Sequence, residues 1–328
     1  MKMMKMMKQP NILKPENKNE YISVFDLKTW MICPRLFFFQ NSHREKNKTE
    51  WEEKNKYFFQ KDPVRFFENE ILREILFCLP EMILENAGEQ ENGTWVDFAG
   101  LENKIRQLIE DLREEMKLLE SENPDEIKKD EIKADEIKKE SGAGNNIFAA
   151  IDDACAEIVR KIPILIQNIS KTIETYGFDL YEAAANPVKS EHVFYFQKIN
   201  LAGAPHKVVL WKEKMVPYLL KTSAPPQNGI WEKDRIAAAA YILILEHEFK
   251  KENVADSFIM DYAGELRIGR IRPQDKKIVF RTLRQIKEAK NGKMPGEKNI
   301  LFCPNCRFQE NCRPKLVSIL SRFWGKGE

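Results

Sequence analysis

Apolar residues in the first half of the chain recur at the spacing of an amphipathic helix. Between residues 64 and 177 they repeat at steps of three and four positions, which places them on one face of a helix. The pattern predicts helices through this region, with Cys78 and Cys155 as small buried apolar residues. The repeat is clearest at Leu101, Ile105, Leu108, Leu112 and Leu119, and again at Phe148, Ile151, Cys155, Ile158 and Ile162.

The sequence between these two helices has a different repeat. "DEIKKDEIKADEIKKE" contains a five-residue unit three times, and "SGAGNN" follows it directly. A period of five matches neither a helical stripe nor the repeat of a solenoid. We therefore expect residues 121–146 to form a flexible, solvated connection within a helical segment that spans residues 64–189.

The pattern changes to short β-rich runs at residue 190. "HVFYFQ", "HKVVLW" and "VPYLL" each predict a strand, and "DSFIMDYAGELRIGRI" predicts two strands around a turn at Ala263 and Gly264. A strong helix, "WEKDRIAAAAYILILEHEFKK", lies between the third and fourth strands, and a basic helix is expected at residues 274–291. This order predicts an α/β (α+β) core at residues 190–298, in which helices flank a mixed sheet.

The stretch "YISVFDLKTWMICPRLFFFQ", which begins at residue 21, carries the signals of a capped helix followed by an aromatic run. Ser23 and Asp26 have the spacing of a capping box, and Cys33 falls at the end of the helix. Pro34 is expected to bend the chain there. We assign residues 21–63 to this N-terminal element.

The composition fits a cytoplasmic globular protein. With 328 residues and 43% hydrophobic side chains, the chain can bury a large core. No run approaches the roughly 18 apolar residues of a membrane helix. Residues 1–20 lack the apolar core of a signal peptide, and we expect them to form a disordered tip. In the reducing cytoplasm, grouped cysteines indicate metal or cluster binding rather than disulfides.

The charges are unevenly distributed although the net charge is only +2. Residues 265–298 carry eleven basic and four acidic side chains. Where such positive charge gathers on one surface, counterion release favours the binding of a polyanion. The candidate nucleic-acid contacts are Arg267, Arg270 and Arg272 in this stretch, and Arg307 and Arg313 beyond it.

Three cysteines lie close together in "LFCPNCRFQENCRP", within a C-terminal region that we delimit as residues 299–328. Their spacing is C-x2-C-x5-C, and thiolates at this density suit zinc or an iron–sulfur cluster. An ordinary zinc ribbon would supply the fourth ligand from a second C-x2-C pair, which this sequence does not contain. The candidates for the fourth ligand are Cys33, Cys78, Cys155 and the four histidines.

Taken together, "ISVFDLKTWMICPRLFFF" and the C-terminal C-x2-C-x5-C resemble the iron–sulfur branch of the PD-(D/E)XK nucleases. The most similar family is that of CRISPR-associated protein 4, whose members are RecB-like exonucleases that help to prepare DNA spacers. The resemblance covers residues 21–45 and 190–314 and implies a restriction-endonuclease-like fold with an enlarged helical insertion.

The resemblance also implies a cofactor. In that family one N-terminal cysteine before Pro-Arg joins three C-terminal cysteines around a [4Fe–4S] cluster, which ties the two chain ends together. The matching residues here are Cys33, Cys303, Cys306 and Cys312. Zinc held by the same four thiolates is the alternative.

The catalytic residues of the family are not matched. Its chemistry needs Mg²⁺ or Mn²⁺ held by an Asp and by the Glu of an E-x-K motif. "LAGAPHKVVL" places His206 at the Asp position, and "VPYLLKTS" places Leu219 at the Glu position and leaves only Lys221. Ala237 stands where the following helix carries a glutamine. We therefore expect an inactive nuclease centre, with Lys221 as its remnant and no Mg²⁺ or Mn²⁺ site.

Three functions follow from these observations. The first is an inactive, cluster-bearing nuclease relative that binds DNA or serves as a partner subunit, for example of a CRISPR integrase. The second is an active Mg²⁺- or Mn²⁺-dependent DNA exonuclease whose carboxylates come from other positions. The third is a non-enzymatic scaffold whose helical segment binds a partner helix. Carboxylates near enough in sequence for the second function are Glu213, Glu232, Asp234, Glu246 and Glu248.

Overall fold

The structure is a computed structural model, and it describes residues 21–46, 62–90, 93–122, 147–298, 300, 303–306 and 308–312. The expectations for residues 1–20, for most of the connection at 121–146, and for Arg307 and Arg313 fall outside these ranges. Within them, no helix is both long enough and apolar enough to span a bilayer.

The centre of the molecule is a mixed sheet, as the sequence predicted, but the predicted strand "HVFYFQ" lies in another sheet and an unpredicted short strand at Lys189–Ser190 takes its place as the fifth strand. Its strand order is β10-β9-β8-β7-β4, and β8 and β9 are parallel while the other neighbours are antiparallel. Helix α9 (Glu232–Phe249) makes the crossover between the two parallel strands. The strands are β4 (Lys189–Ser190), β7 (Lys207–Trp211), β8 (Lys214–Lys221), β9 (Ser257–Tyr262) and β10 (Glu265–Arg270).

A second, three-stranded sheet connects the N-terminal element to this core. Strand β1 (Ile22–Ser23) pairs in parallel with β6 (Leu201–Gly203), which pairs antiparallel with β5 (Phe194–Phe196). Helix α1 (Val24–Ile32) begins directly after β1, so this pairing fixes where α1 starts. The sequence predicted β5 but neither β1 nor β6, because two or three residues show no alternation.

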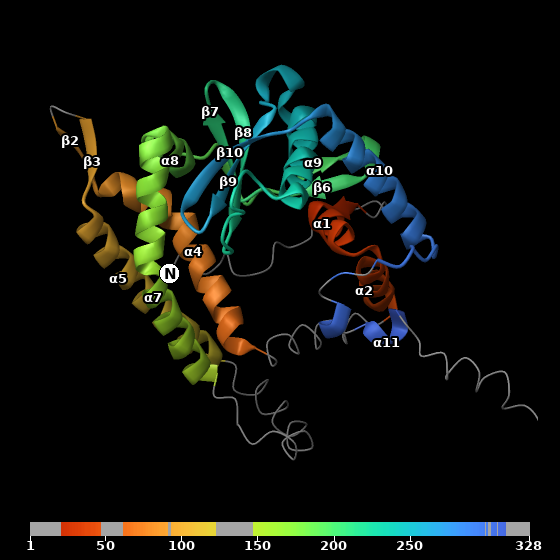
Figure 1. Cartoon of the computed structure of the whole chain (residues 1–328), viewed down its shortest axis with the longest axis horizontal. Helices are drawn as coiled ribbons and strands as arrows, with labels where there is room; N and C mark the ends of the chain where they lie inside the picture. Colours follow the sequence, from red (N-terminus) through yellow and green to blue (C-terminus); the bar gives the residue numbers. More distant parts are fainter. Residues whose placement is uncertain are drawn as a thin grey trace, which may run out of the picture.

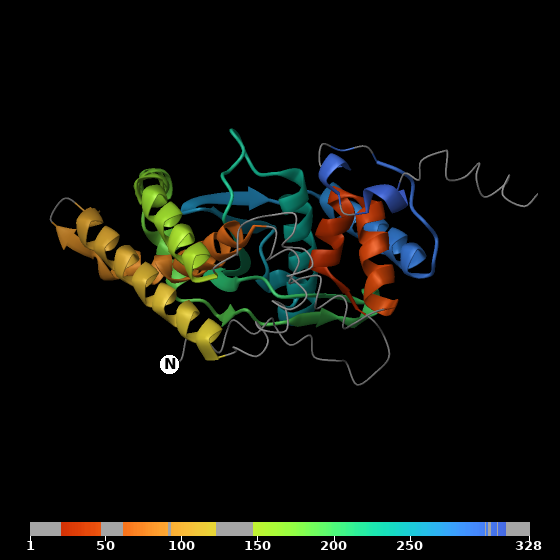
Figure 2. The same cartoon turned by 90° about the horizontal axis from the view of Figure 1, so that it is seen from below.

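Helices cover both faces of the central sheet (Figures 1 and 2). On β8 the side chains alternate: Tyr218 and Leu220 join one buried cluster, and Leu219 joins the other. The first face is covered by α4 (Pro63–Glu85), α5 (Phe98–Glu122), α7 (Ile147–Tyr176) and α8 (Asp179–Ala185). The second face is covered by α1, α9 and α10 (Pro273–Lys290). The predicted helical insertion therefore shares a hydrophobic core with the sheet.

The prediction of helix throughout residues 64–177 was wrong at one place. A hairpin of β2 (Ala87–Gln90) and β3 (Gly93–Val96) lies between α4 and α5. Asn86 ends α4, and Gly88 follows it, and both are poor helix formers. The local Asn and Gly signals therefore outweighed the apolar repeat on either side.

The turn between β9 and β10 ties the sheet to the first helical layer. Ala263 and Gly264 both have positive φ, 48° and 87°, as expected for a two-residue hairpin turn. The Gly264 N–H donates to Asp261 Oδ1 at 2.7 Å, and the Tyr218 hydroxyl donates to Asp261 Oδ2 at 2.7 Å. Burial raises the pKa of Asp261 to about 6. The Tyr181 hydroxyl of α8 donates to the Gly264 carbonyl at 2.9 Å.

Lys207 forms a second connection between the sheet and the helices. Its side chain comes from β7, is 1% exposed, and donates from Nζ to the Phe77 carbonyl at 2.8 Å and the Ala184 carbonyl at 3.0 Å. Ala184 lies in the last turn of α8, where a carbonyl has no helical partner, and Phe77 lies three residues before Pro80 in α4. Lys207 therefore gives the Ala184 carbonyl a partner that the helix cannot supply.

Candidate metal centre

Cys33 lies at the break between two helices. The Ser23 hydroxyl accepts from the Asp26 N–H at 2.9 Å, and the Asp26 carboxylate accepts from the Ser23 N–H at 3.0 Å, which confirms the predicted capping box. Helix α1 ends at Cys33, whose backbone is extended, and α2 (Pro34–Lys46) begins at Pro34. A residue before proline avoids the helical conformation. The side chain of Cys33 is therefore presented from a fixed corner.

The C-terminal cysteines lie on successive tight turns. The 3₁₀ helix η4 (Cys303–Asn305) is followed by the short helix α11 (Gln309–Cys312). The Cys306 N–H donates to the Cys303 carbonyl at 3.2 Å, and the Cys312 N–H donates to the Phe308 carbonyl at 2.8 Å. The C-x2-C-x5-C spacing thus brings three thiols to one side of a compact segment.

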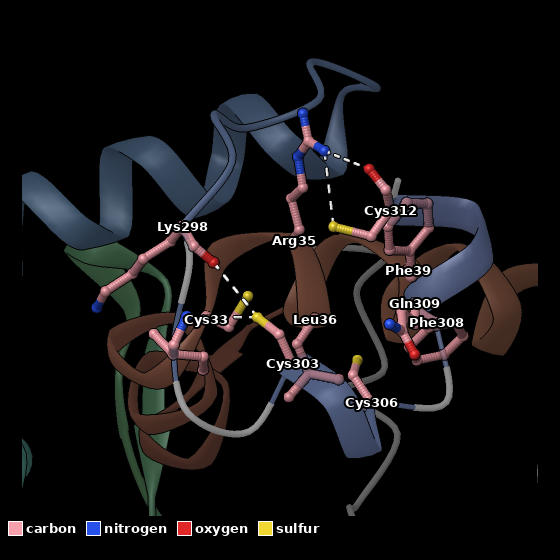
Figure 3. Close-up of a pocket in the computed structure, with 11 residues that line it drawn as sticks. Cys33, Arg35, Leu36, Phe39, Lys298, Cys303, Cys306, Phe308, Gln309 and Cys312 are labelled. Atoms are coloured by element: carbon pink, nitrogen blue, oxygen red, sulfur yellow. Dashed lines mark hydrogen bonds between the residues drawn. The ribbon is translucent and has the colours of Figure 1, made fainter. Parts of the chain in front are cut away.

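Cys33 and the three C-terminal cysteines line one pocket (Figure 3). The N-terminal wall comes from Cys33, which directly follows α1, and from α2, and the C-terminal wall comes from the segment that follows α10. Cys78 and Cys155 instead lie in α4 and α7, in the cluster on the opposite face of the sheet. Burial raises the pKa of both of these thiols to about 11, as expected for inert core cysteines.

Arg35 joins the two walls of the pocket. Its Nη1 donates to the Cys312 carbonyl at 2.7 Å and to Cys312 Sγ at 3.6 Å, and its Nε donates to the Pro295 carbonyl at 3.1 Å (Figure 3). Nearby, the rings of Phe39 and Phe308 stack with centroids 5.5 Å apart. The sequence analysis quoted the Pro-Arg pair but did not identify this contact, because the partners of Arg35 are carbonyls more than 250 positions away.

Replacing Arg35 with glutamine should loosen the C-terminal segment. The loss of three hydrogen bonds from a cationic group is expected to cost about 2 kcal/mol locally. Hydrogen exchange of the amides at residues 303–312 should then be about 30-fold faster. Arg35→Lys should recover part of this protection, and Arg65→Gln, at an exposed position of α4, should change nothing. Unchanged exchange in Arg35→Gln would show that Arg35 does not hold the segment.

The donor set of the pocket is sulfur-rich. Besides Arg35, the backbone N–H of Ile300 donates to a sulfur, Cys303 Sγ, at 3.3 Å. Donors of this kind stabilise thiolates and tune iron–sulfur clusters. A single zinc ion would draw its four sulfurs to about 3.8 Å from one another. Among the described residues, no three Cys, His, Asp or Glu side chains are close enough to hold one metal ion directly. The described lining of the pocket is therefore rich in sulfur and brings hydrogen-bond donors to two of the four cysteines.

The positions that the resemblance assigned to the nuclease centre do meet in space. His206 immediately precedes β7, and its Nδ1 accepts from the Leu220 N–H of β8 at 3.1 Å. Burial lowers the pKa of His206 to about 3, and the cations of Arg73 and Lys28 act in the same direction. The ring is therefore neutral and carries its proton on Nε2.

Leu219 lies in the hydrophobic core, and Lys221 lies in an ion pair. Leu219 is buried against the α9 side of the sheet, and its side chain has no oxygen atom. Lys221 Nζ lies 2.6 Å from Asp234 Oδ2, and the Tyr262 hydroxyl donates to the same oxygen at 3.3 Å. Asp234 belongs to the first turn of α9 and is buried, and its Oδ1 has no hydrogen-bond partner.

Asp234 stands alone among the five carboxylates considered as replacement ligands. Glu213, Glu232 and Glu248 are exposed, and Glu246 pairs with Lys276 at 2.7 Å. No second acidic side chain of the described residues joins Asp234 in a group that could hold a metal. The site therefore offers one carboxylate, which already pairs with Lys221.

The candidate arginines have different surroundings. The Arg267 guanidinium is only 15% exposed and donates to Glu265 at 2.7 Å and to the carbonyls of Pro226 and Gly229 at 2.9 and 2.6 Å. Arg267 is thus engaged within the chain. Arg270 ends β10 and Arg272 precedes α10, and both are exposed.

Comparison with known proteins adds one distant relative. No protein-family model matches the chain. A protein of Archaeoglobus fulgidus described as "Uncharacterized protein" is 27% identical over 128 residues, which are 39% of this chain. The match spans 57% of the length of that relative. This similarity links the chain to an archaeal protein without assigning a family or an activity.

Proposed function

We propose that the chain is an iron–sulfur protein with a PD-(D/E)XK-like fold, similar in plan to the CRISPR-associated protein 4 family, and that it binds DNA without cutting it. The observation that carries this proposal is the single pocket lined by cysteines from both ends of the chain. The parallel pair β8–β9 with its α9 crossover, inside an otherwise antiparallel sheet, is consistent with the proposed fold.

Four side chains would hold the cluster: Cys33, Cys303, Cys306 and Cys312. The cluster would supply a tight crosslink between α1 and the C-terminal segment. The Arg35 guanidinium donates to Cys312 Sγ and the Ile300 N–H donates to Cys303 Sγ, and hydrogen bonds to sulfur are a common feature of iron–sulfur sites.

The absence of cutting follows from the chemistry of the strand ends. A hard divalent cation prefers several oxygen ligands. His206 is neutral and its Nδ1 is occupied by a backbone hydrogen bond, and Leu219 is apolar. Lys221 already neutralises the Asp234 carboxylate. Without a second carboxylate the described site cannot neutralise Mg²⁺ or Mn²⁺.

Metal analysis of protein purified without oxygen tests the proposal. We expect about four irons and about four sulfides per chain, with broad absorption in the visible. If the protein instead contains about one zinc per chain and no sulfide, the four cysteines form a zinc site and not a cluster site. If the purified protein contains neither iron nor zinc at stoichiometric levels, the proposal is refuted.

The orphaned Oδ1 atom of Asp234, beside Lys221, supports a second candidate, a Mn²⁺-dependent exonuclease. The test is cleavage of end-labelled single-stranded DNA in Mn²⁺ by the wild type, Lys221→Ala and Asp234→Asn. We expect no metal-dependent cleavage by any of the three. Cleavage by the wild type that both substitutions abolish would establish the second candidate in place of the first.

A further inference from the structure

Helix α10 has one face in the core and one face in solvent. Val279, Leu283 and Ile286 are buried on its inner face. Its outer face carries four basic side chains and an aromatic ring. These exposed residues are Lys277, Phe280, Arg281, Arg284 and Lys287. They recur at helical steps over ten residues and so form a stripe about 15 Å long.

The four cations of this stripe are not used to hold the fold together. None of them forms a hydrogen bond or ion pair with another described residue. By contrast, Lys276 on the side of the helix pairs with Glu246 at 2.7 Å. Glu288 also lies on the outer face, near Arg284, but its carboxylate is bound by Lys293 at 2.7 Å. The stripe therefore presents positive charge that no described residue of the chain neutralises.

Phe280 lies among these cations and is 46% exposed. A ring that lies between basic side chains suits the stacking of an unpaired base whose phosphates lie on the cations. A duplex keeps its bases stacked inside and would leave the ring unused. An acidic protein would meet the charges but would not need the ring.

We infer that the outer face of α10 is a docking surface for single-stranded nucleic acid, with phosphates on Lys277, Arg281, Arg284 and Lys287 and a base on Phe280. The inference deepens the proposed function by naming the surface and the strand class. It does not depend on the cluster, although α10 packs against α1 and α2 and leads directly into the cysteine segment.

Binding of a fluorescent oligothymidine about 20 nucleotides long, measured from about 50 to about 200 mM salt, tests the charges. Arg281→Gln/Arg284→Gln should weaken binding about tenfold at low salt and reduce the slope of log K against log salt by about 1.4. The matched control is Arg106→Gln/Arg160→Gln, which removes two exposed arginines from α5 and α7 on the other face of the sheet. The control should bind as the wild type does.

Phe280→Ala tests the ring separately. It should weaken single-strand binding about tenfold without changing the salt slope, and it should leave duplex binding unchanged. Equal effects on single strands and duplex, or no effect on either, would overturn the assignment of strand class. Competition by polyglutamate at the potency of the oligonucleotide would indicate an acidic protein partner and overturn the inference.

The cluster and the surface fail independently. All these variants should keep the iron content and melting temperature of the wild type, because the substituted side chains are exposed. Iron-loaded protein that does not bind single strands at low salt would overturn the α10 surface and leave the cluster assignment intact. Iron-free protein that binds single strands with the expected salt dependence would overturn the cluster assignment and leave the α10 surface intact.

Discussion

Replacing Cys33 with serine is expected to strip the protein of most of its iron and to release the C-terminal segment from α1. Serine lacks the soft thiolate that iron prefers as a ligand. Cys33 carries the sulfur atom on the N-terminal side of the pocket. The two walls come from positions far apart, since Arg35 and Cys312 are separated by 277 positions. A covalent closure of that length would stabilise the fold by about 6 kcal/mol in the chain-entropy account.

The Cys33→Ser experiment has matched controls within the same chain. Cys78→Ser and Cys155→Ser change cysteines in the other core cluster and should keep the iron of the wild type. Iron and sulfide content, visible absorption and urea unfolding should be measured on all four proteins. If Cys33→Ser retains about four irons per chain, Cys33 is not a ligand and the closure described above does not exist.

Replacing Lys207 with methionine is the second change with a large expected effect, a loss of about 2–4 kcal/mol in the free energy of unfolding. Methionine keeps the approximate volume but has no donor for the carbonyls of Phe77 and Ala184. Both carbonyls would then lose the Lys207 donor, and the Ala184 carbonyl, in the last turn of α8, has no helical N–H to replace it.

Urea unfolding followed by circular dichroism measures this loss. Lys214→Met, at the exposed start of β8, is the control and should change the unfolding free energy by less than about 0.5 kcal/mol. A wild-type midpoint in Lys207→Met would mean that the two carbonyls are satisfied in another way. The experiment therefore separates a hydrogen-bonding role for Lys207 from simple packing.

The features that sequence predicted are those with a local cause. The Ser23–Asp26 capping box, the corner at Pro34 and the turn at Ala263–Gly264 each depend on a few neighbouring residues. Four of the five strands of the central sheet, β7, β8, β9 and β10, also followed from short runs rich in β-branched and aromatic side chains, whereas β4 did not. The meeting of His206 with β8 followed from placing two motif positions on adjacent strands.

The features that sequence did not predict depend on partners far along the chain. Lys207 reads as an ordinary strand lysine, since nothing near it shows that two helix carbonyls will surround its Nζ. Arg35 binds carbonyls from the other end of the molecule. Asp234 was one of five carboxylates of equal standing until the fold placed it against Lys221. The exposed stripe of α10 required knowledge of which face the core covers.

The pocket between α2 and α11 would set the time at which a growing chain becomes able to take up the proposed cluster. Cys33 leaves the ribosome early, and Cys312 follows 279 residues later, after roughly a quarter of a minute to one minute at ordinary rates of synthesis. A chain that ends before residue 312 lacks at least one of the four thiols. In the proposed site, a product truncated before that residue would not carry a complete ligand set.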